Sequence, residues 1–93
     1  MYRFGITMRV TEASSYNESR DSIAIDWAQY IESNFLDPTY VFLPNIEHNI
    51  IRYLKQFKVN VIILSGGDEL DPNCRRYKTE HALIKYALKN DIP

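Results

Sequence analysis

The sequence contains very little cysteine, glycine and proline, and each shortage excludes a class of protein. The single cysteine, Cys74, leaves no internal disulfide framework and suits a reducing compartment. Three glycines and four prolines among 93 residues are too few for a fibrous or low-complexity chain. With 45% hydrophobic and 25% charged residues, the chain has the composition of an ordinary globular protein, one domain at most, with a core of modest size.

The sequence also lacks clustered charge and long apolar runs. Eleven basic and twelve acidic residues give a net charge of -1, and no block of Lys and Arg suggests a surface for nucleic acid. No apolar run approaches the length that spans a bilayer, and Met1 leads straight into a strand-like segment without the pattern of a leader peptide. We therefore expect a cytoplasmic protein with neither a nucleic-acid nor a membrane partner.

Motifs for cofactors, metals and nucleophiles are missing too. The glycines lack the spacing of a P-loop or a dinucleotide fingerprint. Asp68, Glu69 and Asp71 lack the spacing and turn of a calcium loop, so we expect no metal and no cofactor. Cys74 lies in a polar segment without the strand-to-helix elbow of a thiol nucleophile, and neither histidine lies beside it. The 93 residues therefore contain no complete catalytic set.

The most informative stretch runs from Val59 to Asp71. Its apolar residues at 59–64 predict a central strand covered on both faces, as in a parallel sheet. The strand stops at Ser65, and Gly66 and Gly67 then turn the chain at the edge where open α/β sheets bind ligands. Their amides could donate hydrogen bonds to an oxyanion, which makes both glycines candidate catalytic residues. A plain turn is the alternative interpretation.

The rest of the chain alternates strands and helices. The first expected element is a strand within 2–10 with Phe4, Ile6, Met8 and Val10 on one face, and a polar loop follows it at 11–20. We then expect a helix from Asp21 to Asn34 capped by Asp21 or Ser22, a strand at 40–43 and a helix at 47–56. After the strand at 59–64, we expect a helix at 79–89 capped by Thr79 and the opening of a further strand at Ile92-Pro93. The order β-α-β-α-β-α predicts a three-layer, flavodoxin-like parallel sheet with helices on both faces.

The predicted sheet is incomplete. Its most apolar strand, the third, should lie in the middle, yet the 93 residues supply no obvious second neighbour for it. We therefore expect a missing fourth strand, and we interpret residues 1–93 as the N-terminal part of one larger doubly wound domain.

Several short motifs follow one another in the order seen in class I glutamine amidotransferase-like proteins. They are Phe4-Gly5-Ile6-Thr7-Met8-Arg9, Tyr16-x-Glu18-x-Arg20-Asp21 before Trp27, Leu43-Pro44-Asn45, Ile63-Leu64-Ser65-Gly66-Gly67-x-x-Leu70, and Arg76-x-x-x-Glu80. Over nearly all 93 residues the chain resembles the γ-glutamyl hydrolase, or peptidase C26-like, branch of that family. The γ-glutamyl-γ-aminobutyrate hydrolases and the γ-glutamyl-CDP-amidate hydrolases are both similar, and both stay open.

The resemblance implies a mechanism and a place for each part of it. It implies that the Gly67 amide contributes to an oxyanion hole and that Gly66 shapes the approach. The nucleophilic cysteine would follow the fourth strand, and its histidine and acidic partners would lie further downstream, so residues 1–93 alone should be inactive. The implied reaction is cleavage of a small γ-glutamyl amide through a cysteine thioester. Arg9, Tyr16 and Arg20 could line the mouth of the site and meet a substrate carboxylate or phosphate.

Two other functions stay open. A non-catalytic, flavodoxin-like interaction module could complete its sheet with a partner chain or with a second copy, since an exposed strand edge invites pairing. A phosphoacceptor or flavin-binding domain is the third possibility. It is disfavoured because residues 8–11, at the end of the first strand, are not acidic and only Glu12 lies nearby.

Overall fold

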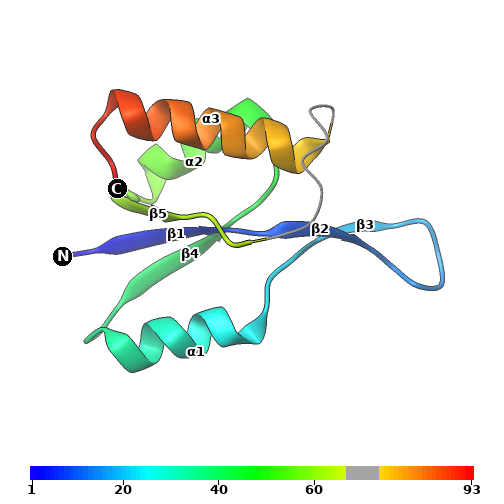
Figure 1. The fold of residues 1–93 in the computed structure, drawn as a ribbon, viewed down its shortest axis with the longest axis horizontal. Helices are drawn as coiled ribbons and strands as arrows, with labels where there is room; N and C mark the ends of the chain where they lie inside the picture. Colours follow the sequence, from blue (N-terminus) through cyan, green and yellow to red (C-terminus); the bar gives the residue numbers. More distant parts are fainter. Residues whose placement is uncertain (67–73) are drawn as a thin grey trace.

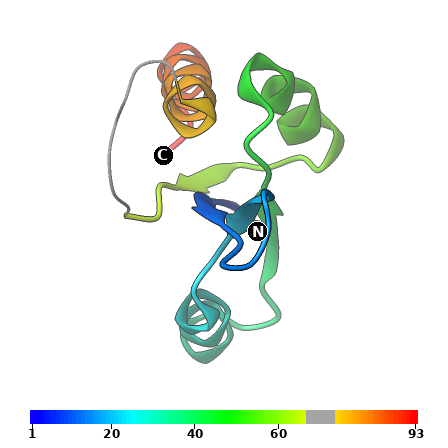
Figure 2. The same cartoon turned by 90° about the vertical axis from the view of Figure 1, so that its right-hand side faces the viewer.

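The computed structural model describes residues 1–66 and 74–93, and it shows a parallel sheet between two layers of helices (Figure 1). Its elements are β1 (Arg3–Thr7), β2 (Arg9–Glu12), β3 (Ser19–Ser22), α1 (Ile25–Asn34), β4 (Thr39–Leu43), the 3-10 helix η1 (Glu47–Asn49), α2 (Ile50–Gln56), β5 (Val61–Ile63) and α3 (Arg75–Lys89). Helix α1 covers one face of the sheet, and α2 and α3 cover the other (Figure 2). The predicted α/β class is confirmed.

The three sheet strands are parallel and lie in the order β4-β1-β5. In their register, Phe4 of β1 lies between Tyr40 of β4 and Val61 of β5. Among these strands the middle position therefore belongs to β1, and the expectation that the most apolar strand is central is wrong for them. The reason lies in the crossovers: the first, through α1, leads from β1 to β4, and the second, through α2, passes to the other side of β1.

Each face of the sheet has its own apolar core. On the α1 side the buried residues are Phe4, Ile6 and Ile31, and on the side of α2 and α3 they are Leu43, Ile50, Leu54, Val59 and Leu83. The second core packs directly on the backbone of β1. A Cβ atom at Gly5 would lie 3.0 Å from side-chain atoms of both Leu43 and Val59. Glycine at position 5 therefore lets this core approach the middle strand.

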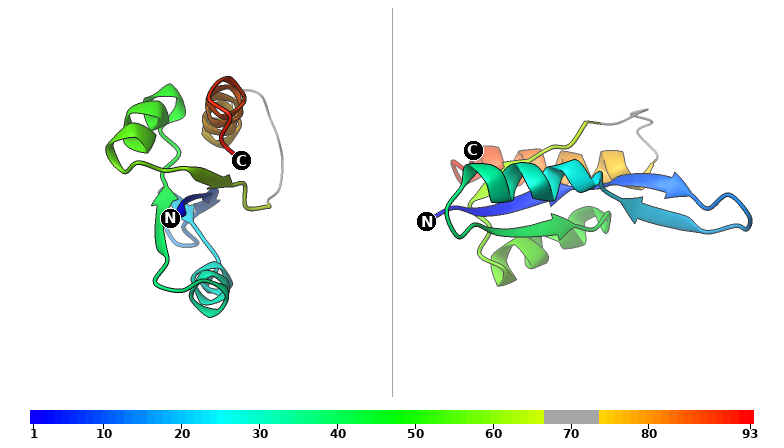
Figure 3. Two further views of the ribbon diagram at one scale, coloured as in Figure 1. Left: turned by 90° about the vertical axis from the view of Figure 1, so that its left-hand side faces the viewer. Right: turned by 90° about the horizontal axis from the view of Figure 1, so that it is seen from below.

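The first strand and the polar segment after it differ from their prediction. β1 ends at Thr7, and the chain then forms an antiparallel hairpin of β2 and β3 in place of the expected loop. The hairpin projects beyond the carboxyl edge of the sheet (Figures 1 and 3). Its strands are mostly exposed, so they carry no apolar face for periodicity to reveal. Val10 accordingly lies at the surface and not in the core.

The hairpin also moves the start of the first helix. Asp21 and Ser22 belong to β3 and not to a cap, and α1 begins at Ile25 without a capping side chain. Its end at Asn34 agrees with the prediction. The predicted second helix is divided into η1 and α2, and α2 begins at Ile50.

Helix α3 begins at Arg75, four residues before the predicted cap Thr79. The actual cap is Cys74, whose Sγ accepts a hydrogen bond from the Tyr77 N–H at 3.4 Å. Thr79 is buried, and its hydroxyl accepts from the Glu47 N–H at 2.9 Å. The first turn of α3 buries polar side chains, and therefore its sequence does not show the apolar period of a helix. No helix in the described part of the chain is long and apolar enough to cross a bilayer.

Candidate functional site

The turn after β5 is fixed to the end of β1 through Ser65. Ser65 is buried, its N–H donates to Thr7 Oγ1 at 2.8 Å, and its hydroxyl donates to the Thr7 carbonyl oxygen at 2.7 Å. Both residues lie at the carboxyl ends of adjacent parallel strands. These bonds hold the start of the Ser-Gly turn at the edge of the sheet where a ligand would bind.

A buried ion pair from α3 supports the same residue. Arg76 Nη2 donates to the Ser65 carbonyl oxygen, and Arg76 Nε donates to Glu80 Oε2 at 2.9 Å. The side chains of Arg76 and Glu80 are only 8% and 13% exposed. A buried charge is costly unless it is paired and hydrogen-bonded, and here Glu80 supplies the charge while Ser65 accepts a further bond. The sequence singled out this pair only within the resemblance, and its contact with the turn was missed.

Gly66 follows Ser65 directly and is the last residue that the structure describes before residue 74. It is exposed, its φ is not in the left-handed region, and a Cβ atom there would have no neighbour within 4 Å among residues 1–66 and 74–93. Neither steric fit nor backbone conformation therefore requires glycine at this position. The Gly66 N–H makes no hydrogen bond to any residue in 1–66 or 74–93. The other predicted oxyanion residue, Gly67, lies outside the described residues.

Asn45 joins the hairpin to the end of β4. Its side-chain amide donates to Asp21 Oδ1 and to the Met8 carbonyl oxygen, each at 2.9 Å, and its backbone N–H donates to Asp21 Oδ2 at 3.0 Å. Asn45 is 1% exposed, and its Oδ1 has no hydrogen-bond partner among the described residues. Sequence reasoning placed Asp21 at a helix cap and missed this pair. In the sequence, the one signal for this pair was the Leu43-Pro44-Asn45 motif at the end of β4.

The three predicted substrate-binding residues lie on the hairpin. Arg20 donates through Nη2 to the Tyr16 hydroxyl, its guanidinium lies 5.5 Å from the Tyr16 ring centre, and its Nε pairs with Glu18 Oε1 at 2.5 Å. The structure therefore brings Tyr16 and Arg20 together. In the hairpin register Arg9 pairs with Ser22 and Thr11 pairs with Arg20, which puts Arg9 and Arg20 on one face. All three predicted side chains are exposed.

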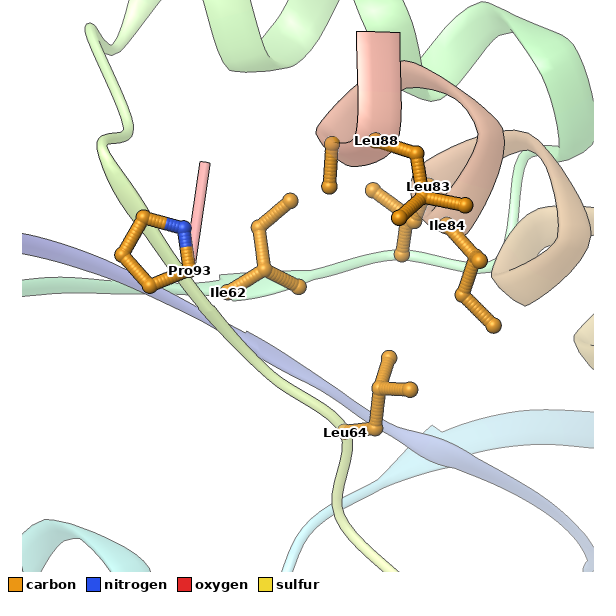
Figure 4. Close-up of a pocket in the computed structure, with 7 residues that line it drawn as sticks. Ile62, Leu64, Leu83, Ile84, Leu88 and Pro93 are labelled. Carbon is orange, nitrogen blue, oxygen red and sulfur yellow. The ribbon is translucent and has the colours of Figure 1, made fainter. Parts of the chain in front are cut away.

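The far edge of β5 makes a hydrogen bond with the last residue of the sequence. The Ile62 N–H donates to the Pro93 carbonyl oxygen at 2.9 Å, so Pro93 lies beside β5. A groove of about 160 Å³ lies next to this contact (Figure 4); it is lined by Ile62, Leu64, Leu83, Ile84, Ala87, Leu88 and Pro93. On the α1 side lies a larger groove of about 500 Å³, lined by Asp26, Trp27, Tyr30 and Ile63. Apolar surface therefore borders the β5 edge on both faces.

Comparison with known proteins gives one curated relative. The chain is 32% identical to a γ-glutamyl-CDP-amidate hydrolase from Campylobacter jejuni subsp. jejuni serotype O:2 over 95 aligned residues. The alignment covers 96% of this chain and 46% of that protein, so the chain spans about half the length of its relative. No family model matches the chain, and no solved structure matches it. The relative is named as a hydrolase, and the chain resembles it along nearly all of its own length.

Proposed function

We propose that residues 1–93 form the N-terminal portion of a glutamine amidotransferase-like γ-glutamyl hydrolase. The enzyme cleaves a γ-glutamyl amide through a cysteine thioester, and the cysteine lies on a segment outside these residues. The observation that carries the proposal is the position of Gly66, an exposed residue that follows a strand end held in place by Thr7 and Arg76. The match to about half of a named hydrolase supports the same assignment.

The proposed reaction uses the turn to stabilise developing negative charge. A thiolate attacks the γ-carbonyl carbon, a C–S bond forms, and the carbonyl oxygen takes up the electron pair. Collapse of this tetrahedral species expels the amine, which takes a proton from an acid on the enzyme, and water then hydrolyses the thioester to glutamate and free thiol. The Gly66 amide, with Gly67 by resemblance, donates to the oxyanion, a contact worth roughly 3 to 4 kcal/mol per donor.

The hairpin supplies the proposed contacts to the rest of the substrate. The Arg9 side chain makes no hydrogen bond or ion pair with any described residue, whereas the Arg20 side chain is already paired with Glu18. Arg9 is therefore the better candidate for an anionic group, and Tyr16 and Arg20 form an aromatic and cationic pair on the same hairpin. The name of the relative describes a CDP-amidate, and phosphate is one anion that this face would accept.

The test uses the full-length product of the gene and γ-glutamyl-p-nitroanilide as the probe. Gly66→Ala keeps the backbone N–H, whereas Gly66→Pro removes it. We expect the alanine variant to keep most of its kcat and the proline variant to lose about 10²- to 10³-fold, the usual effect of removing one oxyanion donor. Equal kcat values for the two variants would contradict the role of the Gly66 amide.

A second candidate function is favoured by the β5 edge. Its two apolar grooves could receive a strand and its flanking side chains from a partner or a second copy, which would make the chain a non-catalytic interaction module. This function predicts a stable dimer or heteromer of the 93 residues and no hydrolysis by the full-length product. The hydrolase proposal predicts hydrolysis by the full-length product, and 93 residues that are inert on their own.

A further inference from the structure

The orientation of the Ser65–Gly66 peptide depends on the buried side chain of Arg76. Three of the hydrogen-bonding groups of Ser65 are engaged: its N–H and hydroxyl by Thr7, and its carbonyl oxygen by Arg76 Nη2. The carbonyl therefore points toward α3. The Arg76 side chain is paired with Glu80, and the residue as a whole is 7% exposed. The donor is therefore fixed in place and cannot readily follow a carbonyl group that points in another direction.

The geometry of a trans peptide carries this constraint to the next residue. None of the described peptide bonds is cis, and in a trans peptide the N–H points opposite to the preceding C=O. With the Ser65 carbonyl directed at Arg76, the Gly66 N–H is directed away from Arg76. Among residues 1–66 and 74–93 it meets no acceptor there, and none of their atoms lies within 4 Å of a Cβ atom built at Gly66.

The opposite orientation is available to the backbone when Arg76 is lost. A peptide flip changes only ψ of Ser65 and φ of Gly66, and glycine accepts almost any φ. Without Arg76, the Ser65 carbonyl would be a buried acceptor with no partner, and flipping it toward solvent would satisfy it. The same flip would turn the Gly66 N–H inward and remove it from the open edge.

We propose that Arg76 is a positioning residue for the oxyanion site, acting through the Ser65 carbonyl to aim the Gly66 N–H at the substrate. This inference rests on the proposed hydrolase function for its catalytic consequence. The structural part of the inference, that Arg76 sets the direction of the Ser65–Gly66 peptide plane, does not depend on the proposed function. The role requires the two-donor geometry of Arg76, because one nitrogen holds Glu80 while another holds Ser65. A lysine at position 76 offers a single ammonium group and would not make both contacts with the same geometry.

The closing experiment measures the peptide plane and the kinetics in the full-length product. The variants are Arg76→Lys and the double change Arg76→Met with Glu80→Met, which removes both buried charges together so that neither is left unpaired. Arg75→Met is the control, since Arg75 is exposed and immediately precedes Arg76. The NOE between Ser65 Hα and the Gly66 amide proton reports the orientation of the peptide plane.

We expect both Arg76 variants to change that NOE and to lower kcat on γ-glutamyl-p-nitroanilide by about 10-fold to 10³-fold, with KM within about threefold of the parent. The Arg75→Met control should leave all three quantities unchanged. A folded double variant with the parental NOE overturns the inference, whatever its activity. A changed NOE in an enzyme whose parent does not hydrolyse the probe upholds the role of Arg76 in aiming the peptide and counts against the proposed function alone.

Discussion

At the scale of single residues, the two described glycines have opposite roles. Gly5 lies in the middle strand, where Leu43 and Val59 leave no room for a side chain. Gly66 lies at the carboxyl edge of the sheet, and no atom of the described part of the chain lies within 4 Å of an added Cβ atom there. Close packing therefore requires a glycine at position 5. At position 66 the described residues create no such need.

The first prediction compares these two glycines. Gly5→Ala should lower the free energy of unfolding by about 1 to 3 kcal/mol, because the methyl group overpacks a buried contact. Gly66→Ala should change it by no more than about 0.5 kcal/mol, as an exposed substitution does. Urea unfolding followed by circular dichroism measures both. A Gly66→Ala variant as unstable as Gly5→Ala would mean that the turn is packed and not open.

A second residue-scale prediction concerns Tyr40 on β4. Its hydroxyl donates to Glu32 Oε2 at 2.9 Å, and this bond, with burial and the negative charge of Glu32, raises the pKa of Tyr40 above 10.0. The stability from this bond is therefore present below the ordinary tyrosine pKa and is lost as the pH rises through the raised one. Glu32→Gln should lower the Tyr40 pKa in an ultraviolet titration. An unchanged titration curve would show that the bond does not form in solution.

At the scale of elements, the hairpin depends on one polar joint. Asp21 of β3 accepts two hydrogen bonds from Asn45, and Asn45 also reaches the Met8 carbonyl oxygen at the start of the hairpin. The hairpin has no apolar face, so this joint is its main described link to the sheet. The position of Arg9 and Arg20 relative to the site consequently depends on Asp21.

The third prediction tests this joint. Asp21→Ala should cost about 1 to 3 kcal/mol of stability, because it leaves two buried donors of Asn45 without acceptors. It should also speed amide hydrogen exchange in β2 and β3 more than in β1. The matched control is Ser19→Ala, which removes only an exposed hydrogen bond to Glu12 on the same hairpin. Equal exchange rates in the two variants would count against the joint.

The elements that the sequence could predict are those with an apolar period. The sheet strand at 39–43, the end of α1 at Asn34 and the apolar β5 were all found within one or two residues, because apolar side chains define them. The hairpin and the first turn of α3 were missed, since polar pairs such as Asp21 with Asn45 hold them and such pairs leave no period. For the same reason, the sequence did not reveal the hydrogen bond from Arg76 to the Ser65 carbonyl oxygen beside the predicted site residue Gly66.

At the scale of the whole molecule, β5 is an edge strand of the described sheet. Pro93 occupies one hydrogen-bonding position on it, and apolar grooves border it on both faces. Leu64, Ile84 and Leu88 are exposed around the smaller groove. In the proposal, the segment that carries the nucleophile would cover this edge as a fourth strand.

The fourth prediction follows for the 93 residues taken alone. Their exposed edge should cause association that increases with concentration in sedimentation velocity, and Leu88→Lys should reduce it by placing a charge on the groove. Leu36→Lys is the control, because Leu36 is 94% exposed, compared with 77% for Leu88, and does not line the groove. An equal effect of the two lysines would mean that association does not involve the edge.

The central claim is that this chain provides the scaffold and oxyanion part of a thiol hydrolase whose nucleophile lies elsewhere in the gene product. The most direct measurement is mass spectrometry of the full-length product, quenched in acid during turnover of γ-glutamyl-p-nitroanilide. The account predicts a γ-glutamyl adduct on a cysteine outside residues 1–93, with Cys74 unmodified because it caps α3. An adduct on Cys74, or turnover with no cysteine adduct, would contradict it.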